Sequence, residues 1–415
     1  MKCRLIWGKP GSPLRKKHMR VCSDSESVQN LVWRDGKELI SGGHTAFRPR
    51  ADRHSPMFGH VNMATMRTAL LVLFLSAFPI VASAEYSKKG QQPPTEFPDL
   101  SLEELMEVDV VPINILGTHT HLEGEWMLGY QFMFMNMDGS RDGTSRISDS
   151  DVLKDFKVTP TNMSMEMHMG MLMYAPSDDL TLMAMLPYIR LEMDHLTRTG
   201  VRFTTASEGI GDLEMTALYT FFRRDFDRHR LVLRAGLSVP TGSIDEKDFL
   251  PGQGKKQLPY PMQLGSGTFD LRPGITYFGQ TENWGWAAEV DGTIRLGENS
   301  NDYTLGDRLH LSAMGTRRLT DWMAPFVRLD GQVWGNIDGA DPALDPTLVP
   351  TADPDRRGGT RVDLTVGVNL YAGEGILRGH RLGIQGGLPI YQSLDGPQLE
   401  TDWQVSIGWQ WIFRL

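Results

Sequence analysis

The stretch "HTHLEGEWMLGYQFMFMNM" (His119–Met137) alternates two kinds of side chain with a period of two residues. Its even positions from Leu122 to Phe134 are largely apolar and aromatic, whereas its odd positions carry histidine, glutamate, glutamine and methionine. Successive side chains of a β-strand point to opposite faces. The pattern therefore indicates a strand with one apolar face and one polar or sulfur-bearing face.

The same alternation recurs to the end of the chain. The segments that show it are 119–136, 163–174, 180–193, 210–223, 230–240, 267–279, 284–296, 307–318, 323–335, 361–371, 380–391 and 401–415. The connections between them are alternately long and short. An even number of strands of about ten residues or more, with short turns at one end and long loops at the other, is typical of outer-membrane β-barrels.

A soluble β-sandwich is the alternative, since its strands alternate as well. Two features argue against it. Tryptophan, tyrosine and phenylalanine gather near strand ends on the apolar faces, as membrane-interface girdles require. Charged residues such as Glu289 and Asp291 occupy the middle of the other faces, where a water-filled lumen tolerates them and a dry core does not. We predict an all-β transmembrane antiparallel β-barrel of about twelve strands over residues 119–415.

An export signal precedes the predicted barrel. In "MATMRTALLVLFLSAFPIVASAEYS" (Met63–Ser87), one arginine is followed by an apolar run and a small-residue cleavage site. We predict a signal peptide over 63–84 and a location in the outer membrane of a Gram-negative bacterium, in contact with its lipid and lipopolysaccharide. Residues 85–118 are predicted to be a periplasmic segment with a short helix near 100–107, where Ser101-x-x-Glu104 resembles a capping box.

Residues 1–62 lie upstream of this signal. Because a signal peptide works when it emerges first, we hypothesise that translation starts at Met63 or Met66 and that 1–62 are an extension outside the folded protein. The alternative is a genuine N-terminal extension followed by a membrane anchor.

Cysteine usage and charge exclude several classes of function. Cys3 and Cys22 both lie upstream of the signal, so residues 85–415 offer no disulfide framework, cysteine zinc site or thiol nucleophile. Of 42 Lys+Arg and 51 Asp+Glu, 13 and 5 lie in the first 84 residues, which leaves the remainder a formal charge of −17. That charge argues against nucleic acid as a partner and favours cations.

Three connecting stretches resemble one known family in order and spacing: "EGIGDLEMTALY" (208–219), "LSVPTGSID" (237–245) and "LGSGTFDLRPGITYF" (264–278). The family comprises Gram-negative outer-membrane proteins labelled as transporters of the meta-pathway of phenol degradation. The resemblance extends over most of residues 85–415. It implies a barrel that passes small organic solutes, and it carries over no catalytic residue.

The residues themselves predict a passive outer-membrane channel for small solutes, and the resemblance implies that these include hydrophobic or aromatic ones. The charged side chains expected to line the pore are Arg230, Arg234, Arg272, Glu289, Asp291, Arg295, Arg361 and Asp363. We expect no enzyme, since the chain lacks G-x-S-x-G, H-E-x-x-H and Gly-rich phosphate-loop motifs. The acid pair Asp212 and Glu214, like the pair Glu289 and Asp291, is interpreted as electrostatic lining.

An alternative function follows from methionine and histidine. Thioethers and imidazoles suit Cu(I) and Ag(I), so in this alternative the chain would bind or pass copper or silver ions in the envelope. We expect no cofactor apart from copper in this alternative. The candidate ligands are His119, His121, Met133, Met135, Met137, His168, Met183 and Met185. The competing interpretation treats methionine as a flexible apolar filler of the barrel wall.

The face taken by "NMSMEMHMGMLMYAP" (Asn162–Pro176) is ambiguous. Placing Glu166 and His168 in the lumen sends the six alternating methionines from Met163 to Met173 to lipid, and the cost of a carboxylate in hydrocarbon favours this choice. A five-residue turn pairing Tyr174 with Leu180 would reverse it.

Overall fold

The computed structural model describes residues 4–5, 20–21, 33–34, 37–38, 117–225 and 227–415. The chain divides into two compact units, Met1–Ser55 and Pro56–Leu415. In the first unit, the described residues form two short antiparallel pairs: β1 (Arg4–Leu5) with β2 (Arg20–Val21), and β3 (Trp33–Arg34) with β4 (Lys37–Glu38). The predicted signal peptide and the predicted helix near 100–107 lie outside the described residues.

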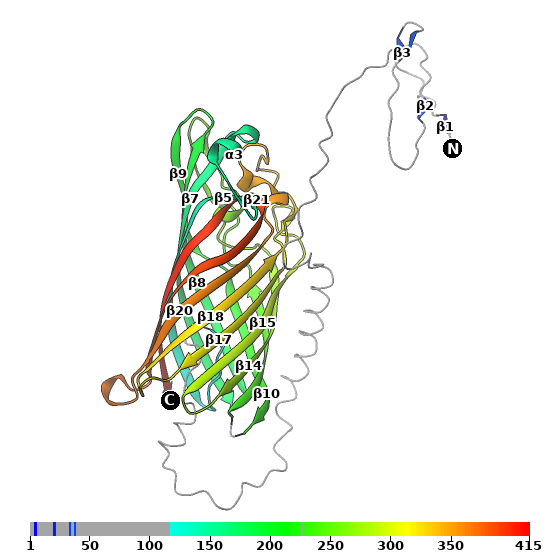
Figure 1. Cartoon of the computed structure of the whole chain (residues 1–415). Helices are drawn as coiled ribbons and strands as arrows, with labels where there is room; N and C mark the ends of the chain where they lie inside the picture. The colour runs from blue at the N-terminus through cyan, green and yellow to red at the C-terminus, as the bar shows by residue number, and fades with distance from the viewer. Residues whose placement is uncertain (1–3, 6–19, 22–32, 35–36, 39–116, 226) are drawn as a thin grey trace, which may run out of the picture. The chain divides into compact units, whose positions relative to one another are not determined.

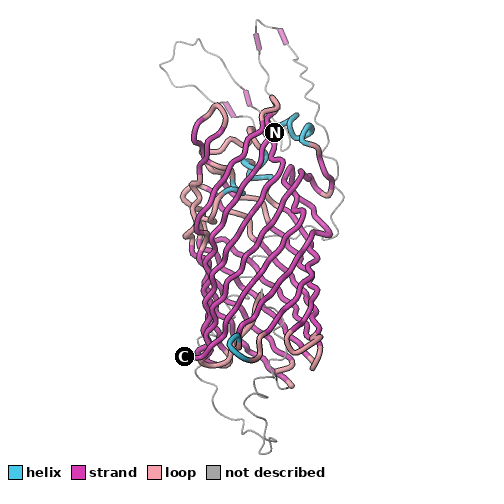
Figure 2. Tube along the Cα trace, turned by 90° about the vertical axis from the view of Figure 1, so that its left-hand side faces the viewer, coloured by secondary structure: helices cyan, strands magenta, loops and turns pink. Residues whose placement is uncertain are grey.

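The second unit is a closed antiparallel β-barrel (Figures 1 and 2). Its ring consists of β10 (Leu213–Arg224), β11 (His229–Val239), β14 (Phe269–Gln280), β15 (Trp284–Leu296), β17 (Arg308–Arg317), β18 (Met323–Trp334), β20 (Gly359–Tyr371), β21 (His380–Arg414), β5 (Glu125–Gly143), β7 (Val158–Ser177) and β8 (Leu180–Thr197). β8 pairs with β10 and closes the ring. Two more strands, β6 (Ser145–Ile147) and β9 (Arg202–Ile210), pair with β5 and β8 outside it.

Strand β21 passes along the wall twice. Its 35 residues pair with β20 up to Leu394 and with β5 from there on. The two halves lie side by side, since Thr401 N donates to Gln392 Oε1 at 3.0 Å near one end. Near the other end, Ile412 N donates to the carbonyl of Gly379 at 3.0 Å. Eleven assigned strands thus close a ring for which the sequence predicts about twelve.

Short turns and long loops segregate to opposite ends, as the sequence predicts. Connections such as 178–179 and 225–228 form the short-turn end, and connections such as 240–268 and 335–358 form the long-loop end. Figure 1 shows the C-terminus at the short-turn end and helix α3 (Asp149–Asp155) at the long-loop end. No helix among the described residues is both long and apolar enough to cross a membrane.

The outer surface of the barrel carries an apolar band. Among its large exposed side chains are Leu128, Tyr130, Leu172, Leu182, Leu186, Tyr188, Leu311, Val327, Leu329, Val366, Leu388 and Ile407. Aromatic side chains lie near the strand ends, and the rings of Trp126 and Tyr174 are 4.5 Å apart. This distribution is that of a wall facing lipid between two interfaces.

The structure corrects the predicted orientation of the methionines in β7. Directly paired residues of antiparallel strands share a face, and Met173 pairs with Met127 while Met163 pairs with Met137. Met127 and Met173 are 0% and 1% exposed, whereas Leu172 between the β7 methionines is 43% exposed. All six β7 methionines therefore face the interior, and the prediction that they face lipid is wrong.

The error has a physical cause. The cost of placing Glu166 in hydrocarbon applies only within the apolar band, but β7 is 20 residues long and carries Glu166 toward the long-loop end. There Glu166 lies directly opposite Arg190, which forms a 2.6 Å ion pair with Glu192 on the outer surface. An outward carboxylate beyond the apolar band meets charged neighbours instead of lipid tails.

Cysteine labelling tests this orientation at neighbouring positions. With Cys3 and Cys22 replaced by serine, Met171→Cys is expected to react with a charged, water-soluble thiol reagent, because Met171 faces the interior cavity. Leu172→Cys is expected to stay unreactive toward that reagent in lipid vesicles, because its side chain faces hydrocarbon. Protection of position 171 together with labelling of position 172 would restore the lipid-facing orientation.

Loops fold into the barrel at the long-loop end. Leu258, Met262 and Leu264 of the 240–268 loop pack against Met163, Leu191 and Met193 on the inner faces of β7 and β8. Met262 belongs to the short helix η2 (Tyr260–Met262), and its carbonyl accepts a 2.7 Å hydrogen bond from Ser207 Oγ on β9. This loop narrows the interior above the cavity described next.

Candidate functional site

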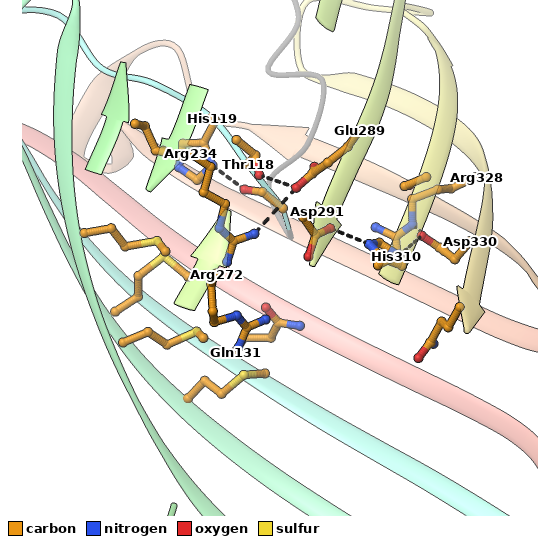
Figure 3. A pocket seen from close by; sticks show the side chains of 18 of the residues that line it. Thr118, His119, Gln131, Arg234, Arg272, Glu289, Asp291, His310, Arg328 and Asp330 are labelled. Carbon is orange, nitrogen blue, oxygen red and sulfur yellow. Dashed lines mark hydrogen bonds and ion pairs between the residues drawn. The ribbon is translucent and has the colours of Figure 1, made fainter. Parts of the chain in front are cut away.

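The barrel encloses a cavity of about 350 Å³ between the in-folded loops and the short-turn end. One side of the cavity carries charged residues and the other carries methionines, as Figure 3 shows. Its lining includes Thr118, His119, Gln131, Met169, Met171, Met173, Met183, Met185, Arg234, Arg272, Glu289, Asp291, His310, Arg328, Asp330, Asp363 and Gln404. A small solute in this space would contact both kinds of surface at once.

Ion pairs hold the charged side together. Glu214 on β10 is 2% exposed and accepts Arg234 Nη2 at 2.5 Å and Arg272 Nη1 at 2.8 Å. Arg234 Nη1 also lies 3.5 Å from Glu289 Oε1, which extends the network from β10 to β15. Glu214 and Glu289 thus each have a guanidinium partner, which offsets the cost of removing the carboxylates from water.

A histidine continues this network along the wall. His310 on β17 places Nδ1 2.7 Å from Asp291 Oδ2 and Nε2 3.3 Å from Asp330 Oδ1. Arg328 Nε donates to the second oxygen of Asp330 at 2.8 Å. We call this group the charged belt: Glu214, Arg234, Arg272, Glu289, Asp291, His310, Arg328, Asp330, Arg361 and Asp363. It spans neighbouring strands from β10 to β20.

The register places every predicted pore-lining residue on the inner face. Arg234, Arg272, Glu289, Asp291 and Asp363 line the cavity itself. The remaining three lie outside it. Arg230 stacks over the Phe278 ring at 5.6 Å, Arg295 pairs with Asp270, and Arg361 pairs with Asp363 at 3.0 Å.

Sequence reasoning missed His310, Arg328 and Asp330. Their signal was present, because "RLHLSAMGTR" and "FVRLDGQV" alternate apolar residues with His310, Ser312, Arg328 and Asp330. A polar face in mid-strand predicts lumen lining by the same rule that identified Glu289 and Asp291.

The opposite side is a methionine wall, which we define as the inward methionines of β5, β7 and β8. Its members are Met127, Met133, Met135, Met137, Met163, Met165, Met167, Met169, Met171, Met173, Met183, Met185 and Met193. Cross-strand pairing aligns them in rows, such as Met127 with Met173 and Met173 with Met183. In Figure 3 the sulfur-bearing side chains lie together on one side of the cavity.

The chain enters the barrel before β5 begins. Strand β5 starts at Glu125, so residues 119–124 do not form the strand that the sequence predicts. Thr118 Oγ1 donates to Glu289 Oε1 at 2.9 Å, while His121 N donates to Thr181 Oγ1 on β8 at 3.0 Å. Residues 118–121 therefore bridge the charged belt and the methionine-bearing strands near the short-turn end.

The structure brings together only part of the predicted metal-ligand set. His119, Met183 and Met185 line one cavity, and the His119 and His121 rings are 5.2 Å apart. Met133, Met135 and Met137 follow β5 toward the long-loop end, where Met137 packs beside the in-folded loop. Within the described residues, no three His, Cys, Asp or Glu side chains form a group that could hold a metal ion.

His168 does not lie beside the inward methionines, contrary to our expectation. It shares the outer face with Phe132, its partner in register, and its Nδ1 lies 2.7 Å from the hydroxyl of Tyr130. The reason is the β7 register, which directs even positions outward once the methionines point inward.

The three stretches that carry the family resemblance meet at Asp212. Its Oδ1 accepts Gly242 N at 2.9 Å, and its Oδ2 accepts Ser266 N at 2.8 Å and Ser266 Oγ at 2.9 Å. Thr241 Oγ1 donates to the carbonyl of Gly211 at 2.7 Å. Asp212 therefore anchors both ends of the in-folded loop to the wall, a structural role in place of the predicted lining role.

Comparison with known proteins gives similarity of fold only. No protein-family model matches the chain. No curated protein matches it in sequence. An outer-membrane channel from Pseudomonas putida F1 is similar, at 15% identity over 71% of this chain and 97% of the other, with a TM-score of 0.52. The β domain of the Bordetella autotransporter Brka gives 12% identity over 70% and 100%, with a TM-score of 0.39. The chain thus shares its fold with an outer-membrane β-barrel.

Proposed function

We propose that this barrel is an outer-membrane channel for the passive passage of small solutes. The observation that supports the proposal is the interior itself, in which the charged belt faces the methionine wall across a cavity of about 350 Å³. A soluble protein would neither bury a row of charges inside a closed sheet nor expose an apolar band on the outside of that sheet.

Because the charged belt forms one side of the cavity and the methionine wall forms the other, the cavity favours solutes that carry both a charged or polar group and an apolar group. Thioethers and aliphatic carbons interact well with apolar or aromatic groups, and the arginines and acids of the belt orient a charged or polar group. We infer that small aromatic carboxylates fit this interior better than sugars of similar size. The family resemblance in the sequence, which implies small organic solutes, agrees with this inference.

Vesicle swelling tests the proposal. Vesicles that contain the purified barrel are expected to swell faster in isotonic benzoate than in isotonic glucose. Met185→Trp should slow swelling because it fills the cavity, whereas Met215→Trp should not, because Met215 is 44% exposed on the outer face. Folded barrels that swell in neither solute, or that swell equally with Met185→Trp, would contradict passage through this cavity.

We also propose export through the signal peptide at 63–84, with a mature chain that begins at residue 85. The apolar run and the small-residue cleavage site at Ala82-Ser83-Ala84 support it. Mass spectrometry of the protein from outer membranes is expected to find an N-terminal peptide that starts at Glu85. A mature N-terminus before Ala82 would contradict it.

A further inference from the structure

His119 and Met127 direct two metal-ligating atoms toward each other. Nδ1 of His119 lies 2.8 Å from the carbonyl oxygen of Gly117, and a carbonyl only accepts, so Nδ1 is assigned the proton. The other ring nitrogen, Nε2, lies 3.3 Å from Met127 Sδ. Imidazole nitrogen and thioether sulfur are both ligands for soft metal ions.

Further thioethers surround this pair. Met173 pairs in register with Met127, and Met183 pairs in register with Met173. Met127 and Met173 belong to one buried cluster, against which Met171 and Met183 pack. We call this group the methionine cup: His119, Met127, Met171, Met173 and Met183. Four of its five members, all but Met127, line the central cavity, which gives an ion a route to the cup.

The need to fill the barrel interior with apolar side chains does not by itself explain why methionines are gathered in the methionine cup. The buried cluster continues around the barrel, but on the other strands its members are Leu218, Val232, Phe278, Ala287, Ala324 and Phe326, with Met314 the one methionine among its buried residues there. Leucine, valine and phenylalanine thus fill the same layer elsewhere. The thioethers concentrate on the side where His119 enters.

We propose that the methionine cup binds a soft monovalent metal ion, Cu(I) or its analogue Ag(I), with His119 Nε2 and Met127 Sδ as the first two ligands and neighbouring thioethers completing the site. A donor set of thioethers and one imidazole selects Cu(I) and disfavours Zn(II), Mg(II) and Ca(II), which need thiolate, further imidazole or oxygen ligands. This site is independent of the channel function, because binding requires no flow through the barrel.

Silver titration of the protein purified from outer membranes in detergent, with Cys3 and Cys22 replaced by serine so that no thiol competes for silver, tests the proposal. With methionine methyl groups labelled with ¹³C, the NMR signals of Met127 and Met173 are expected to shift first and to saturate at one equivalent of Ag(I). His119→Gln and Met127→Leu should each weaken silver binding on the order of tenfold or more, since loss of even outer-shell partners of metal ligands has effects of that size. Met127→Leu nearly conserves volume, so the barrel should remain folded.

Met314→Leu is the matched control, since Met314 is buried in the same layer but lies outside the cavity lining. It should bind silver like the unaltered chain, and Zn(II) should not displace the silver. Three results would overturn the proposal: silver shifts all methionine signals together without saturation, Met127→Leu and His119→Gln bind silver undiminished, or Zn(II) competes equally. The first of these would also identify the methionine wall as apolar filler.

Discussion

Replacing Glu214 by glutamine is expected to destabilise the barrel by on the order of 3 kcal/mol and to shift ion selectivity toward anions. The carboxylate is 2% exposed and is the shared partner of Arg234 and Arg272. Loss of its charge leaves Arg234, whose side chain is 13% exposed, and the partly buried Arg272 with too few counter-charges, and a buried charge that loses its partner is costly. The same excess positive charge in the lumen attracts anions.

Two measurements check this expectation. Guanidinium unfolding in lipid vesicles, followed by tryptophan fluorescence, gives the change in stability, and the reversal potential in a salt gradient gives the selectivity. Glu192→Gln is the matched control, because Glu192 pairs with Arg190 on the outer surface with side chains 43% and 51% exposed, where ion pairs contribute little. Unchanged stability and selectivity in Glu214→Gln would show that the charged belt does not act as a coupled network.

Replacing Gly265 by valine is expected to release the in-folded loop and raise conductance. A Cβ at this position would lie 2.5 Å from the carbonyl oxygen of Gly242 and 2.6 Å from Asp212 Oδ1. Neither the Gly242 backbone nor the Asp212 side chain can move away from the added Cβ without losing the hydrogen bonds that Asp212 accepts from Gly242 and Ser266. Overpacking of this kind costs about 1–3 kcal/mol, and the loss of the Asp212 hydrogen bonds that anchor both ends of the loop adds to this cost.

Gly315→Val provides the comparison, because a Cβ at Gly315 on β17 meets no atom within 4 Å. Single-channel recordings should show larger or more variable steps for Gly265→Val and steps like those of the unaltered chain for Gly315→Val. Equal step size in all three proteins would mean that the 240–268 loop does not limit flow.

The sequence predicts the barrel because its physical signal is local. Each strand must present lipid-compatible side chains on one face and water-compatible ones on the other, so the period of two appears within ten residues, as in "WGWAAEVDGTIRL". The same locality explains why the predicted pore-lining charges fall on inner faces: Arg234, Glu289 and Asp363 each alternate with apolar neighbours.

The orientation of β7 could not be predicted in this way. Methionine is compatible with lipid and with a packed interior, so the alternation of Met163 to Met173 does not distinguish inside from outside. The deciding fact is the register with β5 and the length of β7, which moves Glu166 beyond the apolar band. Both are properties of strand pairing.

Two further features depend on contacts between segments far apart in the chain. Asp212 anchors Gly242 and Ser266, and a single acidic residue at the start of a strand gives no sign of such partners. His119 lies on an apparent continuation of the β5 pattern, yet the strand begins at Glu125 and the preceding residues turn into the lumen. The period-two pattern continues before Glu125 because the lumen face of β5 and the lumen segment that precedes it both favour polar side chains.

Single-channel recording of the purified chain in a planar lipid bilayer tests the proposed channel most directly. We expect discrete conductance steps that scale linearly with voltage and shrink with Met185→Trp, which fills the cavity. Bilayers that contain correctly folded barrels but show no steps would contradict the proposal and would mean that the in-folded loop and the entering chain segment seal the lumen.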